Sequence, residues 1–481
     1  MNQMLTVFIV VVLILIGCFV VIGVGMIFWL FRSKDKDADR EITMIREKLN
    51  PLLTADRLQE KLLESILAIY EAYASFPTYL EFIFSGDPRY NWRAMLEDFR
   101  RDRDIRWLVL VCALPQFILP AKKQRGFSKD MHPQERFVSR MEMSIFSGYV
   151  LDRLIAFAET QNDLSASLRK RLEIMIDSAV IALSHNARLV NGAYLFTYGN
   201  NPQIDNPRLN RIMSQWGVYN DSDSSMVILA VFRRFLNACR AGVLNASAGT
   251  VDRIRVILEA AGVLDHLSTI FKPVYEYVLP RGRTEKHLNF SAYLCYFTGG
   301  ANDADPVLNM NVLNGLFANY QDWKIFDRPE TIKQIHSVLN YLYFLADSRL
   351  LFSPYQHQYY TIPAMAYIWK RFFSTYQSLP EKAIGLLDPQ GRTILINQRM
   401  DEYFKPIFQM SVRRQNCNLF DLALFLQAYP EETVPLQAAL LKCLKEQNGF
   451  IYELFCAVYP IKIIYGSPAM LLSCLLNFRK I

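Results

Sequence analysis

The sequence predicts an all-α protein that begins with a single transmembrane helix. Three observations lead to this prediction. Residues 5–31 form an uncharged segment of 27 residues. From Leu52 onward, apolar side chains recur at helical spacing, and strand-like alternation is scarce. Turns rich in acidic and hydroxyl residues lead directly into apolar helices at several points, which indicates a repeat architecture.

The composition is that of a large folded protein without a strong charge bias. The chain has 481 residues, of which 52% are hydrophobic, enough for one large core or two ordinary ones. The net charge of +7 is mild, and residues of both signs are interspersed. Because no long basic tract is present, we expect no nucleic-acid partner.

The uncharged N-terminal segment is long enough to cross a membrane. A helix over residues 5–31 would span roughly 40 Å, more than the ~30 Å of the hydrocarbon core. A cleaved signal peptide is the alternative, but residues 1–4 carry no positive side chain and no small-x-small cleavage site follows. We therefore expect residues 1–31 to be an anchor that contacts the lipid bilayer through residues 5–31.

The charges after this segment predict its orientation. Basic residues lie on its C-terminal side only, namely Arg32, Lys34, Lys36 and Arg40. By the positive-inside rule, the large C-terminal part is cytoplasmic. None of the eight cysteines forms a C-x-x-C pair, so neither a disulfide framework nor a zinc knuckle is indicated. We expect a single-pass protein of a bacterial inner membrane with a cytoplasmic C-terminal domain.

Residues 32–130 form a predicted juxtamembrane and helical extension. Residues 32–50 are charged and suit a short helix or linker. Beyond them, one helical face carries the apolar residues Leu58, Leu62, Leu63, Ile66, Leu67 and Tyr70. Basic clusters at residues 100–106 and 122–125 could face anionic lipid, but a solvated helix face and a loop are the favoured interpretation.

The repeated turn-to-helix junctions predict the architecture of residues 131–481. The clearest junction is residues 220–232 (NDSDSSMVILAVF). The junctions define a predicted inner set of six apolar helices, which begin near Phe137, Ser224, Pro306, Thr361, Leu419 and Ser467. About six inner helices, each followed by an outer one, would close into an α/α toroid, which leaves no unpaired end repeats. Only short stretches, such as residues 392–396 (RTILI), look extended.

Five short motifs follow one another along this region. They are residues 191–196 (NGAYLF), 221–227 (DSDSSMV), 305–313 (DPVLNMNVL), 440–450 (LLKCLKEQNGF) and 465–470 (YGSPAM). Their order resembles the α/α toroids of terpenoid cyclases and protein prenyltransferases, of the squalene–hopene cyclase type. In particular, DSDSSMV is similar to that family's D-x-D-D-T-A-M-V run, and EQNGF to its Q-x-x-G-x-W repeats.

The resemblance implies a candidate acid. In class II cyclases the middle acid of the run protonates an alkene or epoxide, which requires an unusually strong acid, and aromatic faces then stabilise carbocations. The resemblance assigns Asp223 as general acid and Asp221 as its hydrogen-bonding partner. Ser224 replaces the third acid of the pattern, which changes the hydrogen-bonding set.

Helix capping is the favoured alternative for these acids. Asp and Ser side chains before an apolar helix accept the free N–H groups of its first turn. Capping also accounts for Asp305 and Asn418, which no catalytic assignment needs. Likewise, core packing is favoured over a cavity lining for the aromatic residues Tyr341, Tyr343, Phe344, Tyr359, Tyr360, Tyr367, Trp369, Phe372 and Phe373.

Metal and cofactor sites are not predicted. The prenyltransferase branch of the resembled families binds zinc through Asp, Cys and His, and Cys295 and His357 give only a loose analogy without a nearby carboxylate. The sequence contains no Walker A loop, no G-x-G-x-x-G and no G-x-S-x-G motif. We therefore expect no bound metal and no cofactor.

Two functional hypotheses follow. The first is a non-catalytic or divergent toroid that acts as a binding or scaffold module in a membrane complex. It is favoured by the altered acidic motif, the weak Q-x-x-G-x-W repeats and the N-terminal extension. The alternative is a membrane-associated enzyme that converts an isoprenoid ligand, with Asp223 as acid. Resemblance of fold alone does not establish activity.

Overall fold

The structure is a computed structural model in which part of the chain is described. It describes residues 116–120, 137–161, 164–185, 187–196, 199–203, 220–278, 282–297, 304–352, 362–414, 419–430, 456–457 and 463–466, and singly Glu60, Leu63, Glu64, Leu67, Tyr360, Met470, Ser473, Cys474 and Leu476. The predicted anchor over residues 5–31 and the two basic clusters lie outside these residues. Among the helices that are described, none combines the length and the apolar character needed to cross a membrane.

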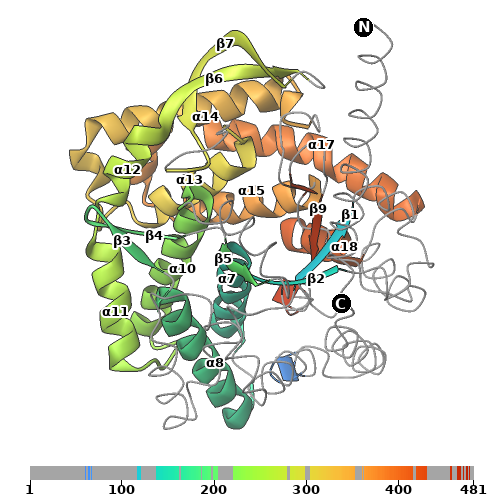
Figure 1. The fold of residues 1–481 in the computed structure, drawn as a ribbon. Coiled ribbons are helices and arrows are strands. Elements are labelled where there is room, and N and C mark those ends of the chain that lie inside the picture. Colours follow the sequence, from blue (N-terminus) through green and yellow to red (C-terminus); the bar gives the residue numbers. More distant parts are fainter. Residues whose placement is uncertain are drawn as a thin grey trace, which may run out of the picture.

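The described part is mostly helical, which confirms the predicted helical class in its coarse form (Figure 1). The α-helices are α7 Ser144–Thr160, α8 Ala166–His185, α10 Ser222–Arg240, α11 Ala248–Glu259, α12 Val263–Ile270, α13 Pro306–Ala318, α14 Pro329–Asp347, α15 Ile362–Gln377, α16 Glu381–Leu387, α17 Arg392–Arg414 and α18 Leu419–Ala428. Two 3₁₀ turns, η4 Ile325–Asp327 and η5 Leu350–Phe352, flank α14.

Five helices form an inner layer in chain order. Helix α7 packs against α10, α10 against α13, α13 against α15, and α15 against α18. Every residue from Pro306 to Phe317 of α13 is buried, including Asn309, Asn311 and Asn314. The predicted starts at Ser224, Pro306, Thr361 and Leu419 fall at or within two residues of the observed ones.

A second layer of helices alternates with the inner layer along the chain. Helix α8 contacts α7 and α11, and α11 contacts α10. Helix α14 contacts α13 and α17, and α17 contacts α15. The first predicted inner start was wrong, because Phe137 lies in a strand and α7 begins at Ser144. The sixth, Ser467, lies outside the described residues.

A five-stranded antiparallel sheet brings together strands from the N-terminal and C-terminal parts of the described chain. Its order is β5-β2-β1-β9-β8, with β5 Gly199–Gln203, β2 Phe137–Met143, β1 Gln116–Pro120, β9 Ile463–Gly466 and β8 Cys456–Ala457. Strand β2 leads into α7, and β9 belongs to the C-terminal part of the chain. Side chains make a second link, because Arg153 of α7 donates to Gln427 of α18, whose amide donates to the carbonyl of Cys474.

Part of the predicted extension packs into the same core. Leu63 and Leu67, from the predicted helical face, are helical and fully buried in the hydrophobic cluster of the inner layer. Strand β1 also comes from residues 32–130, and it pairs with β2 and β9. The domain boundaries themselves stay a prediction.

Two hairpins were not expected, because apolar–polar alternation in their strands is confined to short stretches such as residues 288–292. In the first, β3 (Arg188–Val190) and β4 (Ala193–Leu195) are joined by Asn191 and Gly192, whose φ angles of 45° and 78° suit an Asn-Gly hairpin turn. In the second, β6 (Phe271–Val278) pairs with the largely polar β7 (Gly282–Tyr293). This long hairpin arches over α14 (Figure 1), and β7 contacts that helix.

Residues 392–396 are helical rather than extended. They form the first turn of α17. The carboxylate of Asp388 accepts hydrogen bonds from the backbone N–H groups of Arg392 and Thr393, both at 2.8 Å. This local capping offsets the strand preference of the β-branched residues that follow, so the sequence expectation was wrong.

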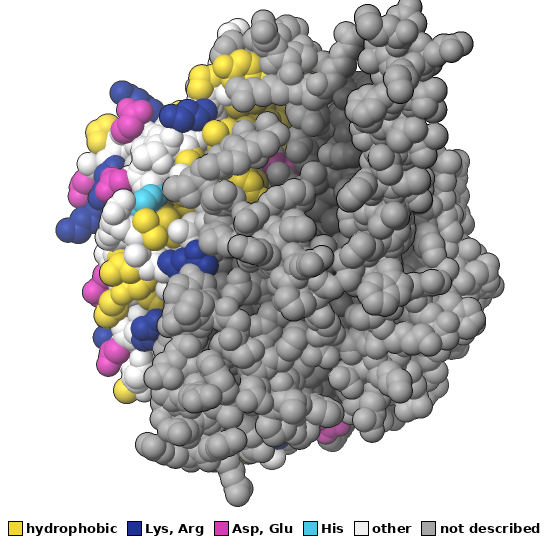
Figure 2. Space-filling model, viewed as in Figure 1, with side chains coloured by type: hydrophobic (Ala, Val, Ile, Leu, Met, Phe, Trp, Pro, Cys, Tyr) yellow, Lys and Arg dark blue, Asp and Glu magenta, His cyan; other side chains and the backbone are white. Residues whose placement is uncertain are grey.

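The surface of the described part carries charges of both signs. Figure 2 shows basic and acidic side chains interspersed along its coloured edge. Three ion pairs contribute: Arg255 with Asp252, Arg328 with Asp265, and Lys333 with Glu330. Such exposed pairs add little stability.

Glycine allows the inner helices to approach closely. A Cβ atom on Gly315 of α13 would lie 2.8 Å from the carbonyl oxygen of Met226 on α10. A Cβ on Gly148 of α7 would lie 2.9 Å from Val227 of α10. A side chain at Gly315 would therefore push α13 and α10 apart.

We expect Gly315→Ala to destabilise the protein by about 1–3 kcal/mol, because the added methyl group overpacks the α10–α13 contact. The free energy of unfolding, measured with urea, tests this expectation. The matched control is Gly385→Ala in α16, where the added Cβ would meet nothing within 4 Å. The control should lie within about 1 kcal/mol of wild type. Equal stability of the two variants would contradict close α10–α13 packing.

Candidate functional site

Asp221 and Asp305 are helix caps, which confirms the capping interpretation for both. Asp221 precedes α10 in an extended conformation, and its Oδ1 accepts from Ser224 N at 2.5 Å. Asp305 precedes α13, and its Oδ1 accepts from Val307 N at 2.7 Å and Leu308 N at 3.2 Å. Asn418 lies outside the described residues.

The two helix starts share a second device that the sequence reasoning missed. Four residues after the capping Asp221, Ser225 Oγ accepts from Phe196 N at 2.9 Å and lies 3.3 Å from Phe196 O. Four residues after Asp305, Asn309 binds both backbone groups of Tyr293 at 3.0 Å. In both cases a polar side chain near the start of a helix forms hydrogen bonds with the backbone of an aromatic residue at the end of a strand. The signal in the sequence is a polar residue four positions after the capping acid.

Asp223 has a different role, because its carboxylate turns toward the inner helices. The residue is 8% exposed. Its Oδ1 accepts from Asn311 Nδ2 of α13 at 2.7 Å, and its Oδ2 accepts from the hydroxyl of Tyr360, just before α15. Asn311 Nδ2 also donates to Tyr149 OH of α7 at 2.7 Å. We call Tyr149, Asp223, Asn311 and Tyr360 the central polar cluster.

The expected hydrogen bond between Asp221 and Asp223 is not formed. Asp221 Oδ1 is used by Ser224 N, and Asp221 Oδ2 is buried without a hydrogen-bond partner. The partners of Asp223 come instead from positions 88 and 137 residues away. Sequence reasoning could not find them, since Asn311 lies in a predicted inner helix and Tyr360 among predicted core aromatics.

Burial makes the acids of this region weak. It raises the pKa of Asp223 to about 7, although the hydrogen bonds from Tyr360 and Asn311 act in the opposite direction. Burial and the neighbouring Asp223 carboxylate raise the pKa of Asp221 well above its usual value. A carboxyl group with a pKa near 7 suits proton transfer at neutral pH, but it is not the strong acid that alkene protonation requires.

A charged group lies beside the central polar cluster. Arg371 of α15 donates its Nε hydrogen to Asp152 of α7 at 2.8 Å, and Arg234 of α10 reaches the same carboxylate at 3.1 Å. Both members of the Asp152–Arg371 pair are buried. Burial alone would raise the pKa of Asp152, but Arg371, Arg234 and Arg153 hold it well below its usual range. The Arg371 guanidinium also lies over the Tyr149 ring, 5.4 Å from its centroid.

Most of the predicted aromatic residues belong to the core. Exposure is 5% or less for Tyr341, Tyr360, Tyr367, Trp369 and Phe372, which confirms core packing for these residues. Tyr367 meets Tyr149 edge to face at 5.9 Å between ring centroids. Tyr343, Phe344 and Phe373 are partly buried and pack against the core. Tyr359 lies outside the described residues.

The described residues offer no cluster of three or more His, Cys, Asp or Glu side chains that could hold a metal ion. Cys295 is buried at the start of α10, where its carbonyl oxygen accepts from Ser222 N at 2.8 Å. Burial raises the pKa of its thiol well above the usual value. This is the behaviour of a structural cysteine rather than a thiolate ligand. His357 lies outside the described residues.

We expect the stability of the wild type to fall relative to Asp223→Asn as the pH rises. Between about pH 4 and about pH 7 the folded protein keeps a proton on Asp223 that the unfolded chain releases, so ionisation favours unfolding. Asparagine cannot ionise. Urea unfolding of both proteins at about pH 5 and about pH 8 should show a relative loss for wild type on the order of a few kcal/mol. If the unfolding free energies of the two proteins changed equally between these pH values, ionisation of Asp223 would not affect stability and the prediction would be wrong.

We expect Asp152→Asn to cost about 3–5 kcal/mol at neutral pH, because it leaves the buried Arg371 guanidinium without a counter-charge. Chemical denaturation measures this cost. Asp252→Asn is the matched control, since Asp252 forms an exposed ion pair with Arg255. Its effect should stay within about 0.5 kcal/mol. A small effect of Asp152→Asn would mean that Arg371 finds another partner.

Comparison with known proteins gave no match at any of three levels. No protein-family model matches the chain, and neither the curated proteins nor the solved structures contain a significant relative.

Proposed function

We propose that residues 131–481 form an α/α toroid of the terpenoid-cyclase type that acts as a binding or scaffold module in a membrane complex. Support for the toroid comes from the inner helices, which contact one another in chain order and alternate with a second layer. A hydrogen bond joins the first and last inner helices, from Arg153 of α7 to Gln427 of α18. The sheet pairs β2, which leads into α7, through β1 with the C-terminal strand β9. The charge-free segment over residues 5–31 supports membrane anchoring, and the basic residues that follow it support a cytoplasmic location.

The observation that favours a non-catalytic module is that the Asp223 carboxylate already accepts hydrogen bonds within the protein. Both of its oxygens accept hydrogen bonds from the protein's own buried side chains, Asn311 and Tyr360. A general acid must instead present its proton to a substrate. The neighbours of Asp223 are polar groups that link helices α7, α10 and α13, so the cluster serves packing specificity. A binding role then belongs to the outer surface of the domain.

One observation favours the alternative, an enzyme that converts a polyprenoid. Asp223 occupies the position of the middle acid in the resembled motif, and its burial raises its pKa to about 7. Strongly perturbed acids gather at functional sites. In this alternative Asp223 is the general acid, and Asp221 supports it by capping α10.

The two proposals differ in what Asp223→Asn should do to the full chain extracted in mild detergent. The scaffold proposal expects crosslinking in native membranes to yield a complex larger than the 55.8 kDa chain, which Asp223→Asn preserves because asparagine retains the packing role. Size and composition are measured by native electrophoresis and mass spectrometry. Asp252→Asn serves as the surface control.

Lipid mass spectrometry on the same samples tests the alternative. The enzyme would be indicated by a co-purifying polyprenoid or triterpenoid whose amount or identity changes in Asp223→Asn but not in Asp252→Asn. A chain that stays monomeric after crosslinking would contradict the scaffold proposal. Circular dichroism of each variant shows that it is folded.

A further inference from the structure

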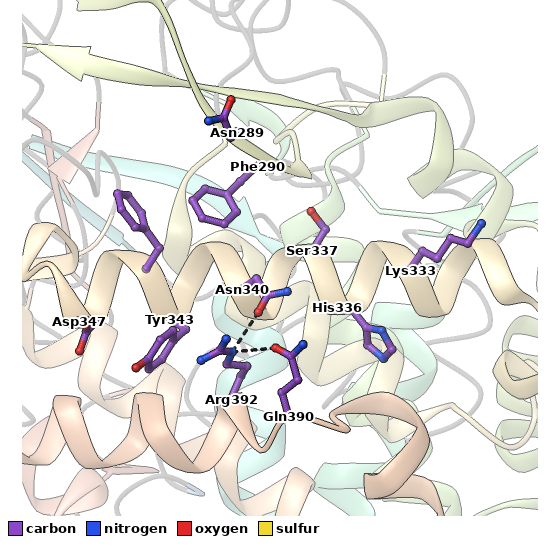
Figure 3. A pocket seen from close by; sticks show the side chains of 11 residues that line it. Asn289, Phe290, Lys333, His336, Ser337, Asn340, Tyr343, Asp347, Gln390 and Arg392 are labelled. Carbon is purple, nitrogen blue, oxygen red and sulfur yellow. Dashed lines mark hydrogen bonds between the residues drawn. The ribbon is translucent and has the colours of Figure 1, made fainter.

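A surface pocket of about 710 Å³ lies between β7, α14 and the start of α17 (Figure 3). It shares no residue with the central polar cluster. Helix α14 contributes one face to it, at positions three or four residues apart: Lys333, His336, Asn340, Tyr343 and Asp347. Its volume is in the range of small-molecule sites, which combine apolar walls with a few fixed polar groups.

Arg392 is held in one orientation by neutral groups. Its Nε is 3.0 Å from Asn340 Oδ1 and 3.0 Å from Gln390 Oε1, as the dashed lines in Figure 3 show. The guanidinium also stacks over the Tyr343 ring, 4.2 Å from its centroid. These contacts orient the cation without neutralising it, and Arg side chains in this state are suited to planar oxyanions.

The charge of Arg392 is not balanced locally. No carboxylate among the described residues forms an ion pair with its guanidinium, and none of their acceptors takes its Nη hydrogens. Asp347, the acid in the pocket lining, is 3.0 Å from Arg399 instead. The second cation of the pocket, Lys333, makes only a distant contact of 3.8 Å with Glu330. Of the two cations that line the pocket, Arg392 is the one whose charge no described carboxylate balances.

Flat apolar side chains line another part of the same pocket. Phe290 of β7 and Phe344 of α14 lie with ring centroids 5.2 Å apart, and both line the pocket together with Tyr343. In Figure 3, Phe290 lies on the β7 side of α14, while Arg392 and Gln390 lie on the α17 side. A pocket lined by an apolar wall on one side and an oriented guanidinium on the other suits a ligand with a flat apolar part and an anionic end.

We propose that this pocket binds a small organic oxyanion, a carboxylate or phosphate carried on a flat apolar group. The two Nη nitrogens of Arg392 contact the oxyanion as a pair, and the side chains of Phe290, Tyr343 and Phe344 contact the flat group. This binding is independent of the scaffold and enzyme proposals, because it uses no residue of the central polar cluster.

The test uses the full chain in detergent and four probes: benzoate, phenyl phosphate, inorganic phosphate and the uncharged benzamide. Saturation-transfer NMR titrations give the affinities, expected in the millimolar range for such small ligands. Benzoate or phenyl phosphate should bind at least about tenfold more tightly than benzamide, and about tenfold more weakly to Arg392→Gln. Whichever of the two binds more tightly identifies the oxyanion. Arg255→Gln, which removes an exposed arginine on α11, should bind like wild type.

Two further comparisons complete the test. Arg392→Lys keeps the charge but loses the planar pair of donors, so its affinity should lie between those of wild type and Arg392→Gln, and thermal melting shows that each variant is folded. The proposal is wrong if neither organic anion binds wild type, if benzamide binds as tightly, or if Arg392→Gln leaves binding unchanged. Equal binding of inorganic phosphate and phenyl phosphate would overturn the role of the apolar wall.

Discussion

The hydrogen bonds of one buried amide hold the centre of this protein together. Asn311 Nδ2 donates to both Asp223 and Tyr149, so a single side chain of α13 fixes its rotation against α10 and α7. Gly315 brings the same helix against the backbone of α10. These contacts depend on each other, because hydrogen bonds near 2.7 Å between helices require close axes, and a glycine permits them. The remaining inner helices, α15 and α18, are held by apolar packing together with the bonds of Arg371 to Asp152 and of Arg153 to Gln427.

Two buried aspartates, Asp152 in α7 and Asp223 in α10, have pKa shifts in opposite directions, and their partners explain the difference. Asp223 is surrounded by neutral donors, so burial dominates and raises its pKa. Asp152 faces three arginines, which outweigh burial and keep it charged. A buried carboxylate with a counter-ion is a structural tie between α7, α10 and α15. A buried carboxyl group with a pKa near 7 changes its charge near neutral pH, so it makes the stability of the fold depend on pH, whatever the protein binds.

The centre and the outer pocket also differ in how far their polar groups are satisfied. In the central polar cluster, the carboxylate of Asp223 already has two donors. At Arg392, amide oxygens and an aromatic face orient the cation, and no acceptor among the described residues takes the hydrogens of its Nη nitrogens. A buried carboxylate with both oxygens bonded contributes to folding, whereas an oriented cation that no described carboxylate neutralises costs solvation that a ligand can recover. The surface of α14 is therefore better suited to bind a ligand than the central polar cluster.

Local signals determined the helices and their caps. Apolar periodicity and the acidic turns were sufficient to predict helix starts at Pro306 and Leu419 and the capping roles of Asp221 and Asp305, because a cap and its N–H partners lie within three residues. Tertiary structure decided the rest. The partners of Asp223 are 88 and 137 residues away, and Arg392 meets Asn340 across 52 residues. No periodicity encodes such meetings, since they arise only when the helices pack. The largely polar strand β7 pairs with β6, its neighbour in the chain, but its contact with α14 arises only when the structure packs, so it could not be recognised from its own residues.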